Sequence, residues 1–242
     1  YGKNFKIILS TSQMTMLPFF FFYLPSSSFS FFSTLNASIQ RETVNKHNEL
    51  RRMTNPIARN ILKMAWNEEA ALNAENWGKK CTLSHSPSKN RKISFANCGE
   101  NIYMSTGIKP WSDVIQEFYD EVKDFRYGYG PTKKAVTGHY IQLVWATSHQ
   151  LGCALSHCLH KKFQYYYICH YCPAPDAVYK PYKTGKSCGD CPDHCDNGLC
   201  TNPCQYEDKY SNCQELKDKL TCNLNEVKLY CKATCKCTSE IK

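Results

Sequence analysis

Three features of common protein classes are missing from this 242-residue sequence. No apolar run is long enough to span a bilayer as a helix, because even Met14–Leu24 is too short. No basic stripe with interleaved aromatic residues is present, which argues against nucleic-acid binding. No cysteine precedes Cys81, so any disulfide framework or metal cluster is confined to the rest of the chain.

The first forty residues contain no acidic side chain and do not read as part of a folded domain. Their apolar run suits the hydrophobic region of a signal peptide, although Pro18 interrupts it. The sequence does not begin with Met, which fits either a leader without its first residues or translation upstream of an internal start. We expect residues 1–39 to be a leader that is removed near Ala37–Gln40.

Asn36 lies in the only acceptor sequence for N-linked glycosylation, Asn36-Ala37-Ser38. This asparagine is a glycosylation site only if it is retained after cleavage of the leader.

Cysteine is strongly over-represented, with sixteen residues in the chain. Six precede a proline-containing segment at 173–186, and ten follow it, so each part can form its own disulfides. Cys169-x-x-Cys172 and Cys188-x-x-Cys191 also fit the spacing of a zinc ribbon, but the other thiols would then have to stay reduced. Together with a signal peptide, the count favours disulfides and a secreted, extracellular protein.

The net charge of +9 is unevenly distributed. Residues 41–187 hold 21 basic and 12 acidic side chains, whereas residues 188–242 hold 7 and 9. The basic excess includes the pairs Arg51-Arg52, Lys79-Lys80 and Lys161-Lys162. Such a surface can attract anionic membranes or glycans, and the alternative is a solvated face without a partner.

Periodicity predicts three helices and two strands in the larger part of the chain. The helices are Val44–Arg52, Ile57–Trp77 and Pro110–Phe125, and the strands are Gly152–Ser156 and Phe163–His170, with loops at 82–97 and 157–162. Cys153 and Cys169 are expected to face each other across the two strands. Glu121 lies on the apolar face of the third helix, and an inward carboxylate needs a partner.

Four motifs together resemble the CAP superfamily and, within it, the mammalian reproductive-tract branch of the cysteine-rich secretory proteins. They are the Cys81-x-x-x-His85 pair, Cys98-Gly99-Glu100-Asn101, Gly138-His139-Tyr140-Ile141-Gln142-Leu143-Val144-Trp145, and the run Tyr167–Pro173. The resemblance extends from Val44 to Lys242. It implies an α+β fold: an α-β-α sandwich CAP domain (40–176), a linker and disulfide hinge (177–203), and a small helical cysteine-rich module (204–242) that resembles ShK-type sea-anemone toxins.

The resemblance also implies eight disulfides, with no cysteine left over. They are Cys81–Cys158, Cys98–Cys172, Cys153–Cys169, Cys188–Cys195, Cys191–Cys200, Cys204–Cys237, Cys213–Cys231 and Cys222–Cys235. The module has too few apolar residues for a core of its own and needs these bridges.

By the same resemblance, His85, Glu100, Glu121 and His139 form the polar group of the CAP cleft. Two imidazoles and two carboxylates can bind a divalent ion such as zinc, weakly, and polarise a water molecule. The alternative is a hydrogen-bonded network without metal. Two departures from the family pattern bear on the cleft: Ile141 replaces the usual Thr, and Pro175-Asp176 replaces Gly-Asn.

The resemblance implies a monomeric, non-enzymatic binding protein that acts through its C-terminal module on an ion channel or a cell-surface partner, with sperm as the setting. Lys228 and Tyr230 are separated by Leu229, which argues against the pore plug that an adjacent Lys-Tyr pair forms in related toxins. Tyr206, Tyr210 and Tyr230 form either a recognition face or a cover over the bridges.

Two other functions are compatible with the CAP domain: carriage of a sterol or another lipid, and metal-dependent hydrolysis at the four polar residues. Against hydrolysis, no Ser or Cys is marked by its sequence context as a nucleophile.

Overall fold

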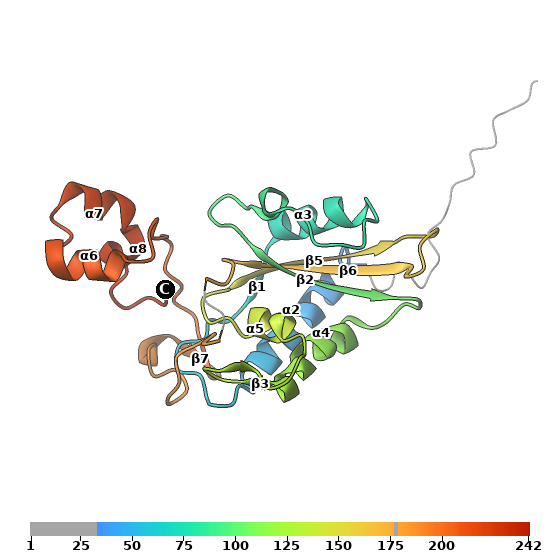
Figure 1. The fold of residues 1–242 in the computed structure, drawn as a ribbon, viewed down its shortest axis with the longest axis horizontal. Helices are drawn as coiled ribbons and strands as arrows, with labels where there is room; N and C mark the ends of the chain where they lie inside the picture. The colour runs from blue at the N-terminus through green and yellow to red at the C-terminus, as the bar shows by residue number, and fades with distance from the viewer. Residues whose placement is uncertain (1–32, 177–178) are drawn as a thin grey trace, which may run out of the picture.

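The computed structural model describes residues 33–176 and 179–242, and these form a larger and a smaller part (Figure 1). In the larger part, a four-stranded sheet lies between α3 on one face and α2, α4 and α5 on the other. The smaller part contains the three short helices α6, α7 and α8. The three-layer α-β-α arrangement of the CAP domain is therefore confirmed. Most of the predicted leader lies outside the described residues.

The sheet has the strand order β1-β5-β6-β2. Its strands are β1 (Ala65–Trp66), β2 (Gly99–Ser105), β5 (Gln150–His157) and β6 (Tyr165–Cys172). β5 and β6 are the two predicted strands at slightly shifted bounds, and Cys153 is directly opposite Cys169 in their antiparallel register. β6 is rich in tyrosine and is buried along almost its whole length, because helices cover both faces of the sheet.

The helix predicted at Val44–Arg52 is longer: α2 spans Ala37–Arg51. The side chain of Asn36 caps it by accepting a hydrogen bond from the backbone N–H of Ser38 at 2.9 Å. Residues 37–39, which the sequence analysis assigns to the leader, form its first turn, and Ile39 is buried. The position of cleavage stays a prediction.

The prediction of a helix at Ile57–Trp77 is wrong for the first half of that range. Residues 57–64 are not helical, and α3 spans only Glu68–Gly78, with the side chain of Asn67 as its N-cap. The backbone of the earlier segment bonds to distant segments instead: Leu62 donates to Ala146, and Lys63 donates to Cys200, at 2.9 and 2.8 Å. The apolar residues of this segment are buried by tertiary contacts rather than on a helix face.

The remaining elements are short. In the larger part they are the 3-10 turns Ser88–Arg91 and Glu121–Asp124, α4 (Trp111–Asp120), β3 (Phe125–Arg126), β4 (Gly130–Pro131) and α5 (Gly138–Leu143). After the linker they are the 3-10 turn Pro192–His194, β7 (Cys195–Asp196), β8 (Leu199–Cys200), α6 (Cys213–Leu220), α7 (Asn225–Tyr230) and α8 (Lys232–Lys236). The predicted third helix thus changes to a tighter 3-10 turn at Glu121.

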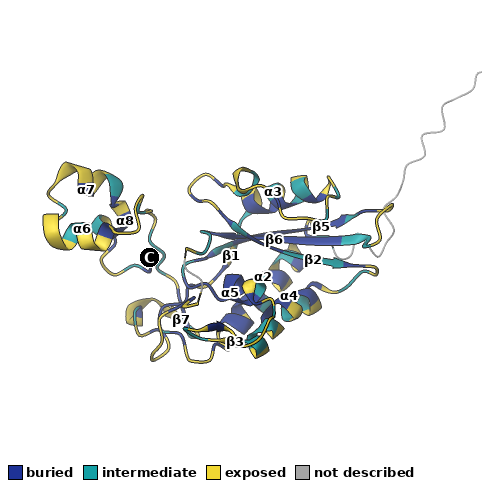
Figure 2. Cartoon of the chain, viewed as in Figure 1, coloured by how far each residue is buried: buried dark blue, intermediate teal, exposed yellow. Residues whose placement is uncertain are grey.

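All sixteen cysteines are paired, in the eight disulfides that the family resemblance implies. The larger part also has an extensive apolar core between the sheet and helices α2, α4 and α5, whereas the C-terminal helices are mostly exposed (Figure 2). In the module, the buried cluster is made of Cys213, Val227 and Cys231. Disulfides there replace a core, each stabilising by about 2–4 kcal/mol.

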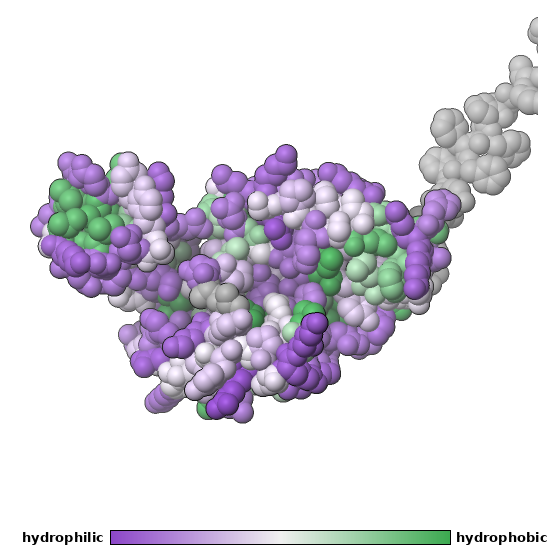
Figure 3. Space-filling view, in the orientation of Figure 1, coloured by the Kyte–Doolittle hydropathy of each residue, from purple (hydrophilic) through white to green (hydrophobic). Residues whose placement is uncertain are grey.

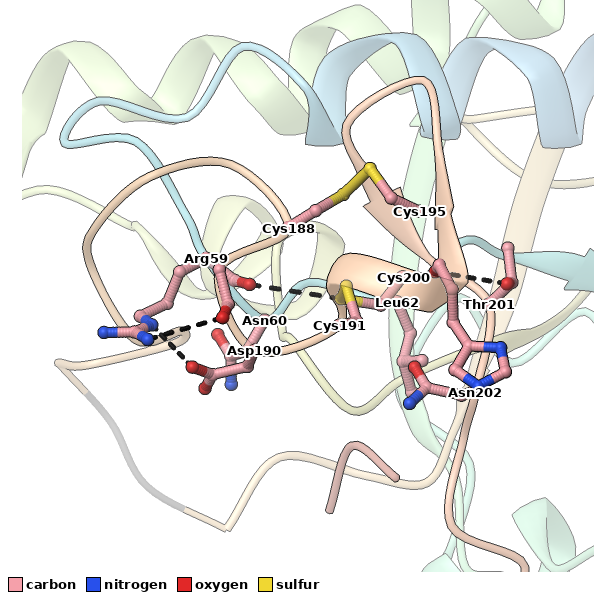
Figure 4. Close-up of a disulfide and its surroundings, with 12 residues drawn as sticks. Arg59, Asn60, Leu62, Cys188, Asp190, Cys191, Cys195, Cys200, Thr201 and Asn202 are labelled. Atoms are coloured by element: carbon pink, nitrogen blue, oxygen red, sulfur yellow. Dashed lines mark hydrogen bonds and ion pairs between the residues drawn. A yellow bond between two sulfur atoms is a disulfide. The ribbon is translucent and has the colours of Figure 1, made fainter. Parts of the chain in front are cut away.

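The disulfide hinge is bound to the non-helical segment 57–64 of the larger part (Figure 4). Arg59 Nε lies 2.5 Å from a carboxylate oxygen of Asp190, and the backbone of Cys200 donates to the carbonyl of Ile61 at 2.8 Å. Leu62 is buried with three hinge cysteines and with Ile241 near the C-terminus. The hinge is therefore fixed to the CAP domain by backbone, ionic and apolar contacts.

Arg51 is fully buried, contrary to its assignment to a surface basic pair with Arg52. Its guanidinium donates to five backbone carbonyls, those of Leu62, Leu143, Trp145, Ala146 and Ser148, at 2.7–3.3 Å. Burial lowers the pKa of Arg51 to about 9, so the side chain is still charged at neutral pH. One cation therefore supplies hydrogen bonds to two loops that pack beside α2.

Replacing this side chain should destabilise the CAP domain strongly. Arg51→Met keeps the apolar stem but leaves buried carbonyls without donors, so we expect the free energy of unfolding to fall by about 3–5 kcal/mol. Chemical denaturation at neutral pH measures this loss. Arg52→Met is the matched control, because Arg52 is exposed and bonds only at the surface to the carbonyl of Asn197. Equal losses in both variants would contradict the assignment.

Candidate functional site

The four polar residues of the predicted cleft come from four different elements and form two separate pairs. His85 lies in the loop after α3, and its Nδ1 is 2.7 Å from Glu100 Oε1 on β2. His139 is in the first turn of α5, and its Nδ1 is 2.6 Å from Glu121 Oε1. Each carboxylate therefore holds one imidazole in a fixed orientation.

Glu121 finds the partner that its inward position requires at the N-terminus of α5. Its Oε2 accepts hydrogen bonds from the backbone N–H groups of His139 and Tyr140, at 2.9 and 3.1 Å. These N–H groups have no acceptor within the helix, and the positive end of the helix dipole also favours a carboxylate. The ring of Phe118 stacks on that of His139, with centroids 5.1 Å apart.

Glu100 belongs to a denser network that includes His170, a residue that the sequence analysis did not assign to the site. The side chain of Glu100 is fully buried. Its carboxylate accepts hydrogen bonds from the backbone N–H and the hydroxyl of Ser86, at 2.9 and 2.6 Å, and lies 3.0 Å from Nε2 of His170. Arg91 is at 3.7 Å. His170 is directly opposite Glu100 in the register of β2 and β6. His170 lies within the motif Tyr167–Pro173. The sequence did not predict β2, however, so the pairing of β2 with β6 could not be inferred.

The network sets the ionisation of Glu100. Burial acts to raise its pKa, but the hydrogen bonds from His170 and from the side chain and backbone of Ser86 outweigh it and lower the pKa to about 2. Glu100 is therefore a carboxylate at every physiological pH.

The structure does not bring the four residues together as one set of metal ligands. Within residues 33–176 and 179–242, no group of three or more His, Cys, Asp or Glu side chains could hold a metal ion. A cavity of about 280 Å³ opens beside Glu121 and His139, and neither His85 nor Glu100 lines it. Because the carboxylates bind the Nδ1 atoms, the donors left for a cation are the Nε2 atoms of the imidazoles, with the carboxylates behind them.

Ser86 does not form the nucleophile of a serine hydrolase. Its hydroxyl donates to Glu100 rather than to an imidazole, so His170 and Ser86 both bond to the same carboxylate. In a hydrolytic triad the imidazole lies between the hydroxyl and the acid. The arrangement orients imidazoles and buries a charge; it does not activate a hydroxyl.

Ile141, which stands where the family pattern has Thr, is buried in the main apolar core. Its backbone N–H bonds to the carbonyl of Thr137 at 3.1 Å, as in a regular helical turn. The substitution therefore removes a hydroxyl without disturbing the helix that holds His139.

Comparison with known proteins assigns both parts of the chain. Residues 44–171 match the model of the "Cysteine-rich secretory protein family" (CAP), and residues 188–242 match the model named Crisp. The chain belongs to the cysteine-rich secretory protein family. The resemblance that the four motifs carried is therefore confirmed.

Curated relatives match over nearly the whole chain. Human "Cysteine-rich secretory protein 3" is 50% identical over 219 residues, which cover 88% of this chain and 89% of the relative. Mouse "Cysteine-rich secretory protein 1" is 47% identical over 213 residues, covering 86% and 87%. Among solved structures, NaASP2 with Zn²⁺ is similar with a TM-score of 0.57 and 26% identity, over 69% of this chain and 96% of that chain.

The Glu100 network should make the free energy of unfolding depend on pH in the acid range. A carboxyl whose pKa is lower in the folded than in the unfolded chain stabilises the fold above its ordinary pKa near 4.5, and this contribution is lost as the pH falls toward 2. Between pH 5 and 2.5, we expect the free energy of unfolding to fall by about 2–3 kcal/mol more in the unmodified protein than in Glu100→Gln.

Denaturant titrations at a series of pH values provide the measurement. Glu117→Gln is the control, because it removes a carboxylate from α4 that is 54% exposed and should leave the pH slope unchanged. Identical slopes in the unmodified protein and in Glu100→Gln would show that the network does not hold Glu100 ionised.

Proposed function

We propose that this protein is a secreted, non-enzymatic binding protein that acts on a cell-surface protein, in particular an ion channel, through residues 204–242. By resemblance to mammalian reproductive-tract members of the family, we propose sperm as the setting. The observations that carry the proposal are two clusters of tyrosine and lysine side chains on the C-terminal module, Tyr206 with Lys236 and Lys209 with Tyr210 and Tyr230. We call the two clusters together the tyrosine face.

The tyrosine face is organised by contacts between lysines and aromatic rings. Lys236 Nζ lies 4.3 Å from the ring centroid of Tyr206, and Lys209 Nζ lies 4.8 Å from that of Tyr230. The rings of Tyr210 and Tyr230 meet edge to face at 5.7 Å. Tyr206 and Tyr210 remain 43% and 46% exposed, which supports a recognition face over a mere cover for the bridges.

The tyrosine face also contains a lysine-tyrosine contact like the adjacent Lys-Tyr pair of channel toxins, although the two residues are distant in sequence. The sequence separates Lys228 from Tyr230, but Lys209 from another part of the module lies over the Tyr230 ring. Amphipathic rings together with cations suit a partner that offers acidic groups beside apolar surface, and rings of acidic side chains are common at the mouths of cation channels.

Other observations support secretion and a non-enzymatic role. Every cysteine is in a disulfide, which fits an oxidising compartment and leaves no thiol nucleophile. The hydroxyl of Ser86 is bound by a carboxylate. In the part of the chain that the structure describes, no helix is both long and apolar enough to cross a membrane.

Removing the two exposed rings should weaken the action on the partner. Truncation of one hot-spot tyrosine costs about 2 kcal/mol and such losses are not additive, so we expect Tyr206→Ala/Tyr210→Ala to lose at least about 30-fold in potency. The measurement is current recording from cells that express a panel of voltage-gated K⁺ and Ca²⁺ channels, together with binding of the labelled, oxidised full chain to the same cells.

The cleft variant His85→Ala/His139→Ala is the control and should retain full potency. Loss of action in the cleft variant with retention in the tyrosine variant would contradict the proposal.

A second candidate, carriage of a sterol or another lipid by the CAP domain, rests on a groove of about 730 Å³ along α3 and β5, part of whose lining, residues 33–35, belongs to the predicted leader. Its size is within the usual range for small-molecule sites, and Ala71, Leu72, Ala154 and Leu155 contribute apolar lining. Uptake of a fluorescent sterol by a protein that has no effect on cells or channels would favour this candidate over the first.

We also propose weak divalent-cation binding by the open Nε2 atoms of the His85 and His139 imidazoles. The carboxylates on their Nδ1 atoms fix the orientation of both rings, as carboxylates do behind metal-bound histidines. His85 is 57% and His139 27% exposed along the side chain, so both are accessible.

Calorimetric titration with zinc should therefore detect binding that is weaker than that of a site with three or four protein ligands, because only two donors are available. We expect His85→Ala/His139→Ala to remove it and His160→Ala/His194→Ala, which alters two exposed histidines elsewhere, to retain it. Equal binding by both variants would contradict the assignment.

A further inference from the structure

The turn between β5 and β6 lies at the end of the molecule farthest from the C-terminal module (Figure 1). The disulfide Cys81–Cys158, with Cα atoms 5.6 Å apart, fastens this turn to the residues that follow α3. It therefore brings Lys79 and Lys80 next to the turn. We call residues 77–80 and 158–163 together the hairpin tip.

The hairpin tip concentrates positive charge. Lys79, Lys80, Lys161 and Lys162 are all exposed, and so is His160. Lys79 pairs with Glu75 at 2.8 Å. Among the described residues, no acidic side chain lies within 4 Å of the ammonium groups of the other three lysines. Net positive charge is thus left without an internal counter-ion.

The same tip exposes apolar and aromatic surface between the lysines. Leu159, which follows Cys158 in the turn, is 58% exposed. Lys162 Nζ lies 5.6 Å from the ring centroid of Phe163, and Lys80 Nζ lies 4.8 Å from that of Trp77. Figure 3 shows hydrophobic residues beside hydrophilic ones at this end of the molecule.

We infer that the hairpin tip binds the surface of a membrane that contains anionic lipids. The lysines would contact the headgroups, and the side chains of Leu159 and Phe163 would enter the boundary between headgroups and acyl chains. A sulfated glycan also attracts lysines, but it offers no apolar surface to bury the exposed Leu159 of the same turn. The combination of charge with a projecting apolar residue therefore favours the bilayer.

This inference does not depend on the proposed action of the tyrosine face. The two surfaces lie at opposite ends of the long axis, so a protein docked by its hairpin tip would leave the module accessible to other partners (Figure 1).

The test is co-sedimentation of the oxidised full chain with vesicles of phosphatidylcholine alone and of phosphatidylcholine with about 30% phosphatidylserine. We expect binding to the anionic vesicles only, and its loss as salt is raised. Each lysine near such a surface is worth about fivefold in affinity, so Lys161→Ala/Lys162→Ala should weaken binding about 25-fold. Lys228→Ala/Lys232→Ala, which removes two exposed lysines of the C-terminal module, should leave it unchanged.

Leu159→Ser distinguishes a membrane from a glycan. Insertion contributes about fourfold per buried methylene, so this variant should bind anionic vesicles several-fold more weakly while its affinity for heparin stays the same. Equal vesicle binding by the unmodified protein and the Lys161/Lys162 variant would overturn the inference. So would binding to heparin without binding to anionic vesicles, or no binding to either.

Discussion

The buried guanidinium of Arg51 is the interaction on which the arrangement of the CAP domain depends. All of its hydrogen bonds go to backbone carbonyls, and one acceptor is the carbonyl of Leu143, the last residue of α5. At the other end of this six-residue helix, the carboxylate of Glu121 accepts from two backbone N–H groups. A helix too short to be stable alone thus has a cation at its C-terminus and an anion at its N-terminus, both of which match its dipole. His139 owes its position to this double capping.

How far the sequence predicted this structure differs between local and distant interactions. The strand β6 was predictable because tyrosine and isoleucine in a short run favour a buried strand. The inward position of Glu121 followed from steps of three and four along an apolar face. The helix prediction at Ile57–Trp77 failed in its first half because Ile61 and Leu62 are buried by tertiary contacts with other loops and the hinge, and not on a helix face. Arg51 looked like surface charge, since nothing local reveals five distant carbonyls.

The candidate site shows the same division. The family resemblance identified four of the polar residues, and three of them, His85, Glu100 and His139, lie in motifs that are continuous in the chain. The motifs did not reveal His170 as the partner of Glu100, which requires the register of β2 and β6. Nor could they show that Glu100 would bind His85 and Glu121 would bind His139, so that the four residues form two pairs. Spacing along a chain specifies which groups are available, and the packing of helices and strands decides which atoms of those groups remain open.

The attachment of the disulfide hinge has a mechanical consequence. Arg59, Ile61 and Leu62 hold the hinge through side chain and backbone, and Ile241 near the C-terminus packs into the same cluster. These contacts oppose rotation of the hinge against the CAP domain and so restrict how far the module can move relative to it. If both proposed surfaces were occupied at once, the length of the molecule would set the separation at which it joins them.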